Sequence, residues 1–149
     1  MVERSLFRQK APGVMGQLMT DFDLDAVQAA GVLGNIGTEC AGFHHLHEIG
    51  QPEGKGGYGW CQWTGPRRAT FFQYCDAKGM DWQSDDANYG YLQHELRGEY
   101  RRTIAALEKT GTLRAAVRAF ERNFERAGIP NYKDRDQWAE IAYDAYRGR

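Results

Sequence analysis

Residues 24–38 decide the fold, and they read LDAVQAAGVLGNIGT. Apolar or small side chains occupy nearly every position of this stretch, so it lacks the broad polar face that a surface helix turns toward water. A helix that is apolar nearly all round is buried, and we therefore expect residues 24–38 to form the central helix of the molecule. Asp23, directly before the stretch, is the predicted N-cap.

Glu39 follows this stretch and is the only Asp, Glu, Lys or Arg between residues 26 and 47. Burial penalises a carboxylate anion, and the partial negative charge at a helix C-terminus acts in the same direction, so we expect a raised pKa. A carboxyl that keeps its proton near neutral pH can protonate the leaving sugar oxygen when a glycosidic bond breaks. The alternative is a buried structural carboxylate paired with an arginine.

The rest of the chain is predicted to be mostly helical. Apolar spacing indicates an N-terminal helix over residues 12–20 and a helix that begins near Pro66. The same spacing predicts further helices over residues 89–96, 113–124 and 138–145. Ser84, Thr112 and Asp134 mark the starts of these last three helices. No repeat or linker divides the chain, so we interpret residues 1–149 as a single domain.

Residues 42–64 lack helical periodicity and are predicted to form loops with a short hairpin. Within them, residues 56–64 read GGYGWCQWT and combine the groups that a sugar site uses. Glycines allow close approach of a ligand, Tyr58 and Trp63 can cover the apolar faces of sugar rings, and Gln62 can both donate and accept. The alternative is a tight turn over an aromatic core, because Trp60 and Trp63 lie three residues apart.

Three segments carry a resemblance to a known family. Residues 34–43 (GNIGTECAGF), 57–68 (GYGWCQWTGPRR) and 120–127 (FERNFERA) resemble the phage tail lysozyme family. In that family, and in the related goose-type lysozymes and lytic transglycosylases, a Glu ending a helix is the acid and a Gly-x-x-Gln segment lines the cleft. The resemblance thus implies that Glu39 is the catalytic acid and that Gln62 binds substrate.

The resemblance also suggests a second acidic group. Many phage lysozymes place an acidic residue or Cys nine positions after the catalytic Glu, and Glu48 falls there. Its role would be to position water or to stabilise positive charge on the sugar, with a solvated loop carboxylate as the alternative. Thr64 is a further water-positioning candidate, and His44 is a candidate contact for substrate. The chain departs from the family pattern at Cys40 and at Trp60-Cys61, which predicts a narrower or differently lined cleft.

Other chemistries fit the sequence less well. The histidines at 44, 45 and 47 with Cys40 and Cys61 show no zinc-ligand spacing, so we expect no metal and no cofactor. A Cys-His peptidase would need a low-pKa thiol and an oriented imidazole. Free thiols are the default interpretation of three cysteines, with a Cys40–Cys61 bridge as the alternative. A net charge of −1 supplies no general attraction to nucleic acid or to anionic lipid.

The sequence therefore predicts a mainly α, lysozyme-like α+β fold with a central buried helix, a small hairpin or loop lobe and a C-terminal helical bundle. We expect a monomeric muramidase, of the phage endolysin type, that hydrolyses the glycan strands of peptidoglycan. A lytic transglycosylase using the same Glu39 and a non-catalytic wall-binding or tail-assembly module are the alternatives. The first twenty residues contain no apolar run long enough for a signal peptide or membrane span. We thus expect synthesis in the host cytoplasm and action on the wall, after holin-dependent release or from a phage tail, with the short chain favouring the endolysin.

Overall fold

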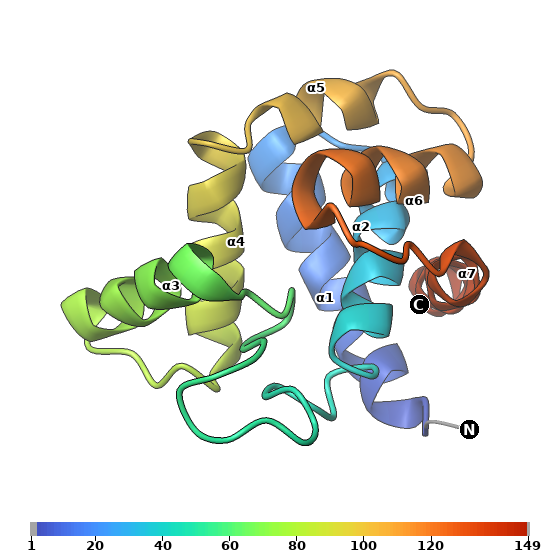
Figure 1. Ribbon diagram of the computed structural model, residues 1–149. Helices are drawn as coiled ribbons and strands as arrows, with labels where there is room; N and C mark the ends of the chain where they lie inside the picture. Colours follow the sequence, from blue (N-terminus) through green and yellow to red (C-terminus); the bar gives the residue numbers. More distant parts are fainter. Residues whose placement is uncertain (1–2, 149) are drawn as a thin grey trace.

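The computed structural model describes residues 3–148, which fold mainly into helices (Figure 1). These residues form α1 (Ser5–Phe22), α2 (Ala26–Glu39), α3 (Gly65–Lys78), α4 (Asp85–Arg97), α5 (Arg102–Glu108), α6 (Leu113–Phe120), the π-helical turn η1 (Glu121–Glu125) and α7 (Tyr132–Arg147). The mainly α, lysozyme-like architecture predicted from the sequence is confirmed. None of the described helices is both long enough and apolar enough to span a membrane.

The predicted central helix is α2, which packs against α1, α6 and α7. Its start differs from the prediction, because Asp25 rather than Asp23 is the N-cap. The Asp25 carboxylate accepts from the backbone N–H of Gln28 at 2.8 Å, and the Gln28 side chain accepts from the backbone N–H of Asp25 at 3.0 Å. This reciprocal pair satisfies two free donors at the helix start. Asp23 instead ends α1 in a left-handed conformation, with φ of 56°.

Three glycines at spacings of three let other helices approach the α2 backbone closely. A Cβ atom at Gly37 would lie 2.5 Å from the Cγ atom of Trp138 in α7, and one at Gly34 would lie 2.5 Å from the carbonyl oxygen of Arg135. At Gly31, a Cβ atom would collide with Ala116 of α6. Glycine is therefore required on this face of α2, and the close approach brings α7 beside the end of α2 that carries Glu39.

Most predicted helix starts agree with the structure. The hydroxyl of Ser84 accepts from the N–H of Ala87 at the start of α4, and Thr112 caps α6 in the same way. Helix α7 begins at Tyr132, two residues before the predicted start at Asp134. The predicted helix over 113–124 is α-helical only to Phe120 and then widens into η1. The short helix α5 was not predicted.

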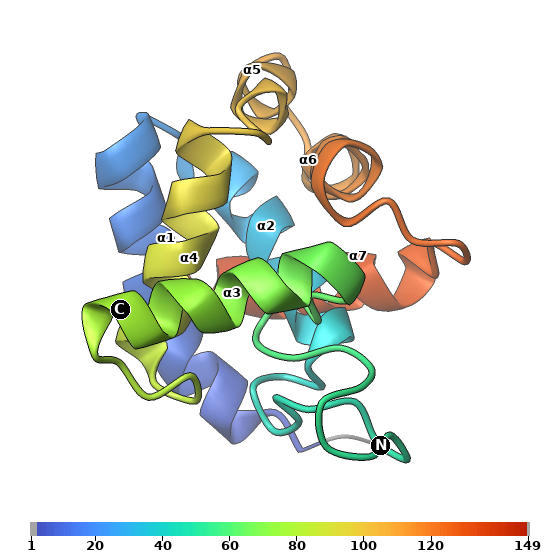
Figure 2. The ribbon, with the colours of Figure 1, turned by 60° about the vertical axis from the view of Figure 1, so that its left-hand side comes forward.

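Residues 40–64 form the loop lobe at one end of the molecule, opposite α5 and α6 (Figures 1 and 2). The predicted hairpin is reduced, among the described residues, to two isolated antiparallel bridges, His47 to Tyr58 and Tyr58 to Trp63. Aromatic side chains fill the interior of the lobe: Trp60 packs edge-on against Phe43, with ring centroids 5.2 Å apart. The loop is therefore a small packed unit joined to the C-terminus of α2.

Candidate active site

Glu39 is the last residue of α2 and faces α7. The Nη2 atom of Arg135 donates to Glu39 Oε2 at 2.6 Å, and Nη1 of the same guanidinium donates to Asn35 Oδ1 at 2.9 Å. The Arg135 side chain is only 2% exposed, whereas that of Glu39 is 20% exposed. The guanidinium therefore fixes the carboxyl from the buried side, and part of Glu39 still faces solvent.

The pKa of Glu39 lies above its ordinary value, as its position in the sequence predicted. Burial raises it most strongly, and the negative charge of Glu121 acts in the same direction. The positive charge and hydrogen bond of Arg135 lower it, without cancelling the effect of burial. Glu39 therefore combines the features of both interpretations, since its carboxyl has an arginine partner and its pKa is raised.

The two aromatic residues predicted to bind sugar lie inside the loop lobe. Tyr58 is 4% exposed, stacks on His47 with ring centroids 4.0 Å apart, and accepts from the N–H of Gly54 through its hydroxyl oxygen at 2.9 Å. Trp63 is 1% exposed, and its indole N–H donates to Glu95 Oε1 at 2.8 Å. Both side chains hold the lobe together in this conformation, and their contact with sugar remains a prediction.

Gln62 and Glu48 are also bound within the lobe. Gln62 adopts a positive φ of 53°, and its side-chain amide donates to the carbonyl oxygen of Gly59 at 2.9 Å. The Glu48 carboxylate is exposed and accepts from the backbone N–H of Gly57 at 3.0 Å. Each polar group therefore fixes one of the two buried glycines, Gly57 and Gly59, and so holds the backbone of the lobe in place.

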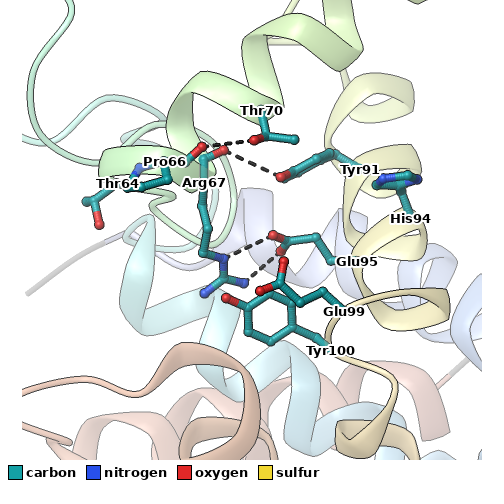
Figure 3. Close-up of a pocket in the computed structure, with 9 residues that line it drawn as sticks. All are labelled: Thr64, Pro66, Arg67, Thr70, Tyr91, His94, Glu95, Glu99 and Tyr100. Atoms are coloured by element: carbon teal, nitrogen blue, oxygen red, sulfur yellow. Dashed lines mark hydrogen bonds and ion pairs between the residues drawn. The ribbon is translucent and has the colours of Figure 1, made fainter.

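Thr64 and His44 are both exposed, and their side chains have different neighbours. His44 Nε2 lies 3.2 Å from a carboxylate oxygen of Glu3. Thr64 lies at the start of α3 and borders a cavity of about 410 Å³ (Figure 3). Thr64 is the only one of the predicted site residues among those that line this cavity: Thr64, Pro66, Arg67, Thr70, Tyr91, His94, Glu95, Glu99 and Tyr100.

An ion pair between α3 and α4 closes one wall of that cavity. Figure 3 shows Arg67 extended toward Glu95, with its Nη2 atom 2.7 Å from Glu95 Oε1 and its Nε atom 3.0 Å from Glu95 Oε2. The third donor of the guanidinium, Nη1, reaches the carbonyl oxygen of Phe124 at 2.9 Å. Arg67 thereby links α3, α4 and η1, in which Phe124 is followed by one last residue.

That residue, Glu125, is a half-buried glutamate that the sequence did not single out. Its Oε2 atom is buried and has no hydrogen-bond partner within residues 3–148. Burial raises the pKa of Glu125 well above its ordinary value, and the negative charge of Glu39 raises it further. The positive charges of Arg135 and Arg67 both act against this shift. The only sequence signal was its place in the segment 120–127, where it is one of two glutamates.

The cysteines and histidines supply no competing chemistry in the part of the chain that the structure covers. Cys40, Cys61 and Cys75 are free and buried, so the alternative Cys40–Cys61 bridge is not formed. Burial raises the pKa of the Cys40 thiol to about 12 and that of Cys61 well above its ordinary value, which is contrary to what a nucleophilic thiol requires. No three His, Cys, Asp or Glu residues of the described segment lie together in a metal-binding group.

Comparison of the sequence with known proteins gives a family match. The model of the phage tail lysozyme family matches residues 10–146, nearly the whole chain. No curated protein matches the sequence. The match includes α2, the loop lobe, η1 and most of α7, so all of the residues discussed above except Glu3 fall within it.

Proposed function

The chain belongs to the phage tail lysozyme family, with a lysozyme-like action on peptidoglycan, and from that premise we propose that it cleaves the glycan strand with Glu39 as the general acid. The observation that carries this proposal is the state of Glu39 at the end of α2. Its carboxyl is partly exposed, and burial raises its pKa above the ordinary value. A carboxyl with a raised pKa keeps its proton to a higher pH and can give it to the leaving oxygen of a glycosidic bond.

Arg135 gives this carboxyl a defined orientation. Because Nη2 of Arg135 donates to Oε2 of Glu39, the proton is left to Oε1. A general acid must lie within hydrogen-bond reach of the atom that it protonates, so a fixed oxygen is favourable for the reaction. Arg135 thus has two effects: it lowers the pKa of Glu39, and it fixes which oxygen atom carries the proton.

We propose that water completes the reaction, so that the enzyme is a muramidase. The exposed carboxylate of Glu48 and the exposed hydroxyl of Thr64 are the groups proposed to position that water. In a lytic transglycosylase, the 6-hydroxyl of the muramic acid would attack instead and leave an anhydro end. Both reactions need the proton from Glu39, and they differ in the product.

The decisive experiment is Glu39→Gln. The amide keeps the volume of the side chain and an oxygen that can accept from Arg135, but it has no proton to transfer. We expect glycan cleavage to fall by about 10²- to 10⁴-fold, with a fold close to intact. Loss of turbidity of cell-wall substrate and thermal unfolding are measured in parallel, with Glu108→Gln as the matched control at an exposed carboxylate outside the proposed site. Mass spectrometry of the muropeptides then distinguishes reducing ends from anhydro ends.

Other outcomes of these experiments would contradict the proposal. If Glu39 is only the partner of Arg135, its replacement destabilises the protein by about 3–5 kcal/mol, and the folded fraction keeps its activity. A stable Glu39→Gln variant with wild-type lysis would refute the proposed acid. A wild-type digest dominated by anhydromuramic ends would refute hydrolysis and retain Glu39. Absence of any glycan cleavage by the wild-type protein would favour a non-catalytic wall-binding module.

A further inference from the structure

A second cavity lies where α4 passes into α5, beside the end of η1, and has a volume of about 290 Å³. Its lining includes three arginines, Arg101, Arg102 and Arg126, and one carboxylate, that of Glu99. This arginine cavity therefore has an excess of two positive charges, in a chain whose net charge is −1. The chain as a whole supplies no attraction for anions, whereas a local cluster of this kind does.

The guanidinium groups of the arginine cavity are exposed, and none of the three forms an ion pair within residues 3–148. Arg101 donates to the carbonyl oxygen of Gly98 at 2.9 Å. By contrast, Arg67 and Arg135 are each paired with a glutamate. A guanidinium binds planar anions such as carboxylates through two parallel hydrogen bonds. The cavity therefore offers free donors of the kind that recognises a carboxylate.

Thr103 adds a polar group to the wall of this cavity. Its side chain is 0% exposed, and its hydroxyl has no hydrogen-bond partner within residues 3–148. Most buried polar groups of folded proteins are hydrogen-bonded, because an unsatisfied one costs free energy. Since Thr103 lines the cavity, an acceptor bound there would supply the partner that this hydroxyl lacks.

The arginine cavity adjoins the cavity of Figure 3, because Glu99 and Tyr100 line both. The Tyr100 ring has a guanidinium on the side of each: the Cζ atom of Arg67 lies 4.0 Å from the ring centroid, and that of Arg126 lies 5.3 Å from it. Thr64, which borders the cavity of Figure 3, is one of the groups proposed to position water. A substrate bound beside Thr64 can therefore continue past Tyr100 to the arginines.

We propose that the arginine cavity binds the carboxylates of the peptides that peptidoglycan carries on its muramic acid residues. The inference rests on the proposed function, because it assigns this cavity to the same substrate. The N-acetylated sugars of the glycan are uncharged where a peptide is attached, so the carboxylates of the substrate are on its peptides. Arg102 and Arg126 are the residues that bind them, since their guanidinium groups have no ion-pair partner in the described chain.

The first test is binding of N-acetylmuramyl-L-alanyl-D-glutamate, whose single sugar has no glycosidic bond to cleave, measured by NMR titration. The comparison compound is the same molecule with both glutamate carboxyls converted to amides. We expect the acid to bind the wild type about tenfold more tightly than the amide, because bonds between guanidinium and carboxylate are charge-assisted. In the double variant Arg102→Gln and Arg126→Gln, this preference should fall to about twofold or less.

The double variant Arg8→Gln and Arg122→Gln is the matched control. It removes the same charge at exposed positions that do not line the arginine cavity, and it should keep the preference for the acid. Thermal unfolding of both double variants shows whether each is folded. If the variant of Arg102 and Arg126 does not fold, the preference of the wild type for the acid over the amide decides the matter.

Cleavage gives a second readout. The KM for glycan strands with intact peptides should rise about tenfold in Arg102→Gln and Arg126→Gln, because binding of the substrate is weakened. On the same strands after an amidase has removed the peptides, the difference from the wild type should shrink to about twofold or less. The effect would then depend on the peptide and not on the sugar chain.

Three results would overturn the proposal: equal binding of the acid and the amide, no binding of either, or the same loss in the control variant. Walls with and without their phosphate polymers form a further arm, and an effect that follows the phosphate would identify a different ligand and refute the peptide. If the proposed function is wrong instead, Glu39→Gln will cleave like the wild type. The binding measurement needs no cleavage, so it still decides whether the cavity takes the peptide.

Discussion

The Glu39 side chain combines an ion pair with a raised pKa. Arg135 binds one oxygen of the carboxyl at 2.6 Å, yet the pKa of Glu39 is raised because burial outweighs the attraction of the guanidinium. An isolated surface pair would have the opposite result, since water would remove the penalty of burial. The pKa of Glu39 is therefore set by its burial and by its neighbours Arg135 and Glu121.

The raised pKa values predict how stability depends on pH. Glu39 and Glu125 both ionise above their ordinary value of 4.5, so the folded protein binds more protons than the unfolded chain at pH values above 4.5. This contribution to stability is complete below pH 4.5 and is lost as the pH rises through the folded-state pKa values. We therefore expect the Tm of the wild type to fall as the pH rises through these pKa values. The Tm of Glu125→Gln should depend less steeply on pH.

Thermal unfolding from about pH 4 to pH 9 tests this expectation, because the ionisation of a buried group enters directly into the unfolding free energy. As the pH rises, the Tm of Glu125→Gln should increase relative to that of the wild type. A Glu48→Gln control, at an exposed carboxylate, should follow the wild type. Parallel curves for Glu125→Gln and wild type would contradict a raised pKa at position 125.

At the residue scale, the sequence predicted Glu39 but not its surroundings. The absence of other charges from residues 26–47 was enough to single out Glu39. An arginine partner was one of the alternatives, but nothing local identifies Arg135, which lies 96 residues further along the chain. Glu125 was not identified for the same reason, because Glu39 and Arg67, whose charges act on its pKa, lie far from it in the sequence.

At the scale of elements, the glycine face of α2 determines where α7 lies. A Cβ atom at Gly37 would come 2.5 Å from Trp138, so Gly37→Ala must push α2 and α7 apart. We expect it to destabilise the protein by about 1–3 kcal/mol, as overpacking usually does. It should also lower glycan cleavage in the folded protein, because Trp138 and Arg135 are on the same helix.

Gly13→Ala is the matched control for this prediction. Gly13 lies in α1 and is exposed, and a Cβ atom added there would have no neighbouring side chain or loop within 4 Å. Alanine there should stabilise the helix by about 0.5–1 kcal/mol, because glycine is the more flexible residue when unfolded. Chemical denaturation measures both variants. If Gly37→Ala were as stable as Gly13→Ala, the close contact of α2 with α7 would not be required for stability.

Helices were more predictable from the sequence than the loop lobe. Ser84 and Thr112 mark helix starts through short-range hydrogen bonds that are encoded locally. The shift of the α2 cap from Asp23 to Asp25 reflects a choice between two aspartates that only the Gln28 partner resolves. Residues 42–64 carry no periodicity, and the burial of Tyr58 and Trp63 depends on α3 and α4 packing over them. Sequence alone identified these aromatic groups but could not place them inside the lobe.

For the molecule as a whole, we expect activity without any metal ion. A structural or catalytic zinc needs three or four ligands in a defined geometry, and no such group occurs within residues 3–148. Incubation with EDTA should leave glycan cleavage and Tm unchanged. Loss of activity with EDTA, and its return on addition of zinc, would show that a metal takes part and that the mechanism from Glu39 is incomplete.

The bond between Arg135 and Glu39 also has a consequence for how the protein is made. The two residues are 96 positions apart, so the ribosome produces the carboxyl long before the guanidinium that orients it. Chains fold as they emerge, N-terminal parts first, and contacts across long separations form late. A nascent chain that ends before α7 has Glu39 but lacks the arginine and the packing that shape its surroundings. The Glu39 carboxyl therefore gains its orienting partner only after α7 has been synthesised.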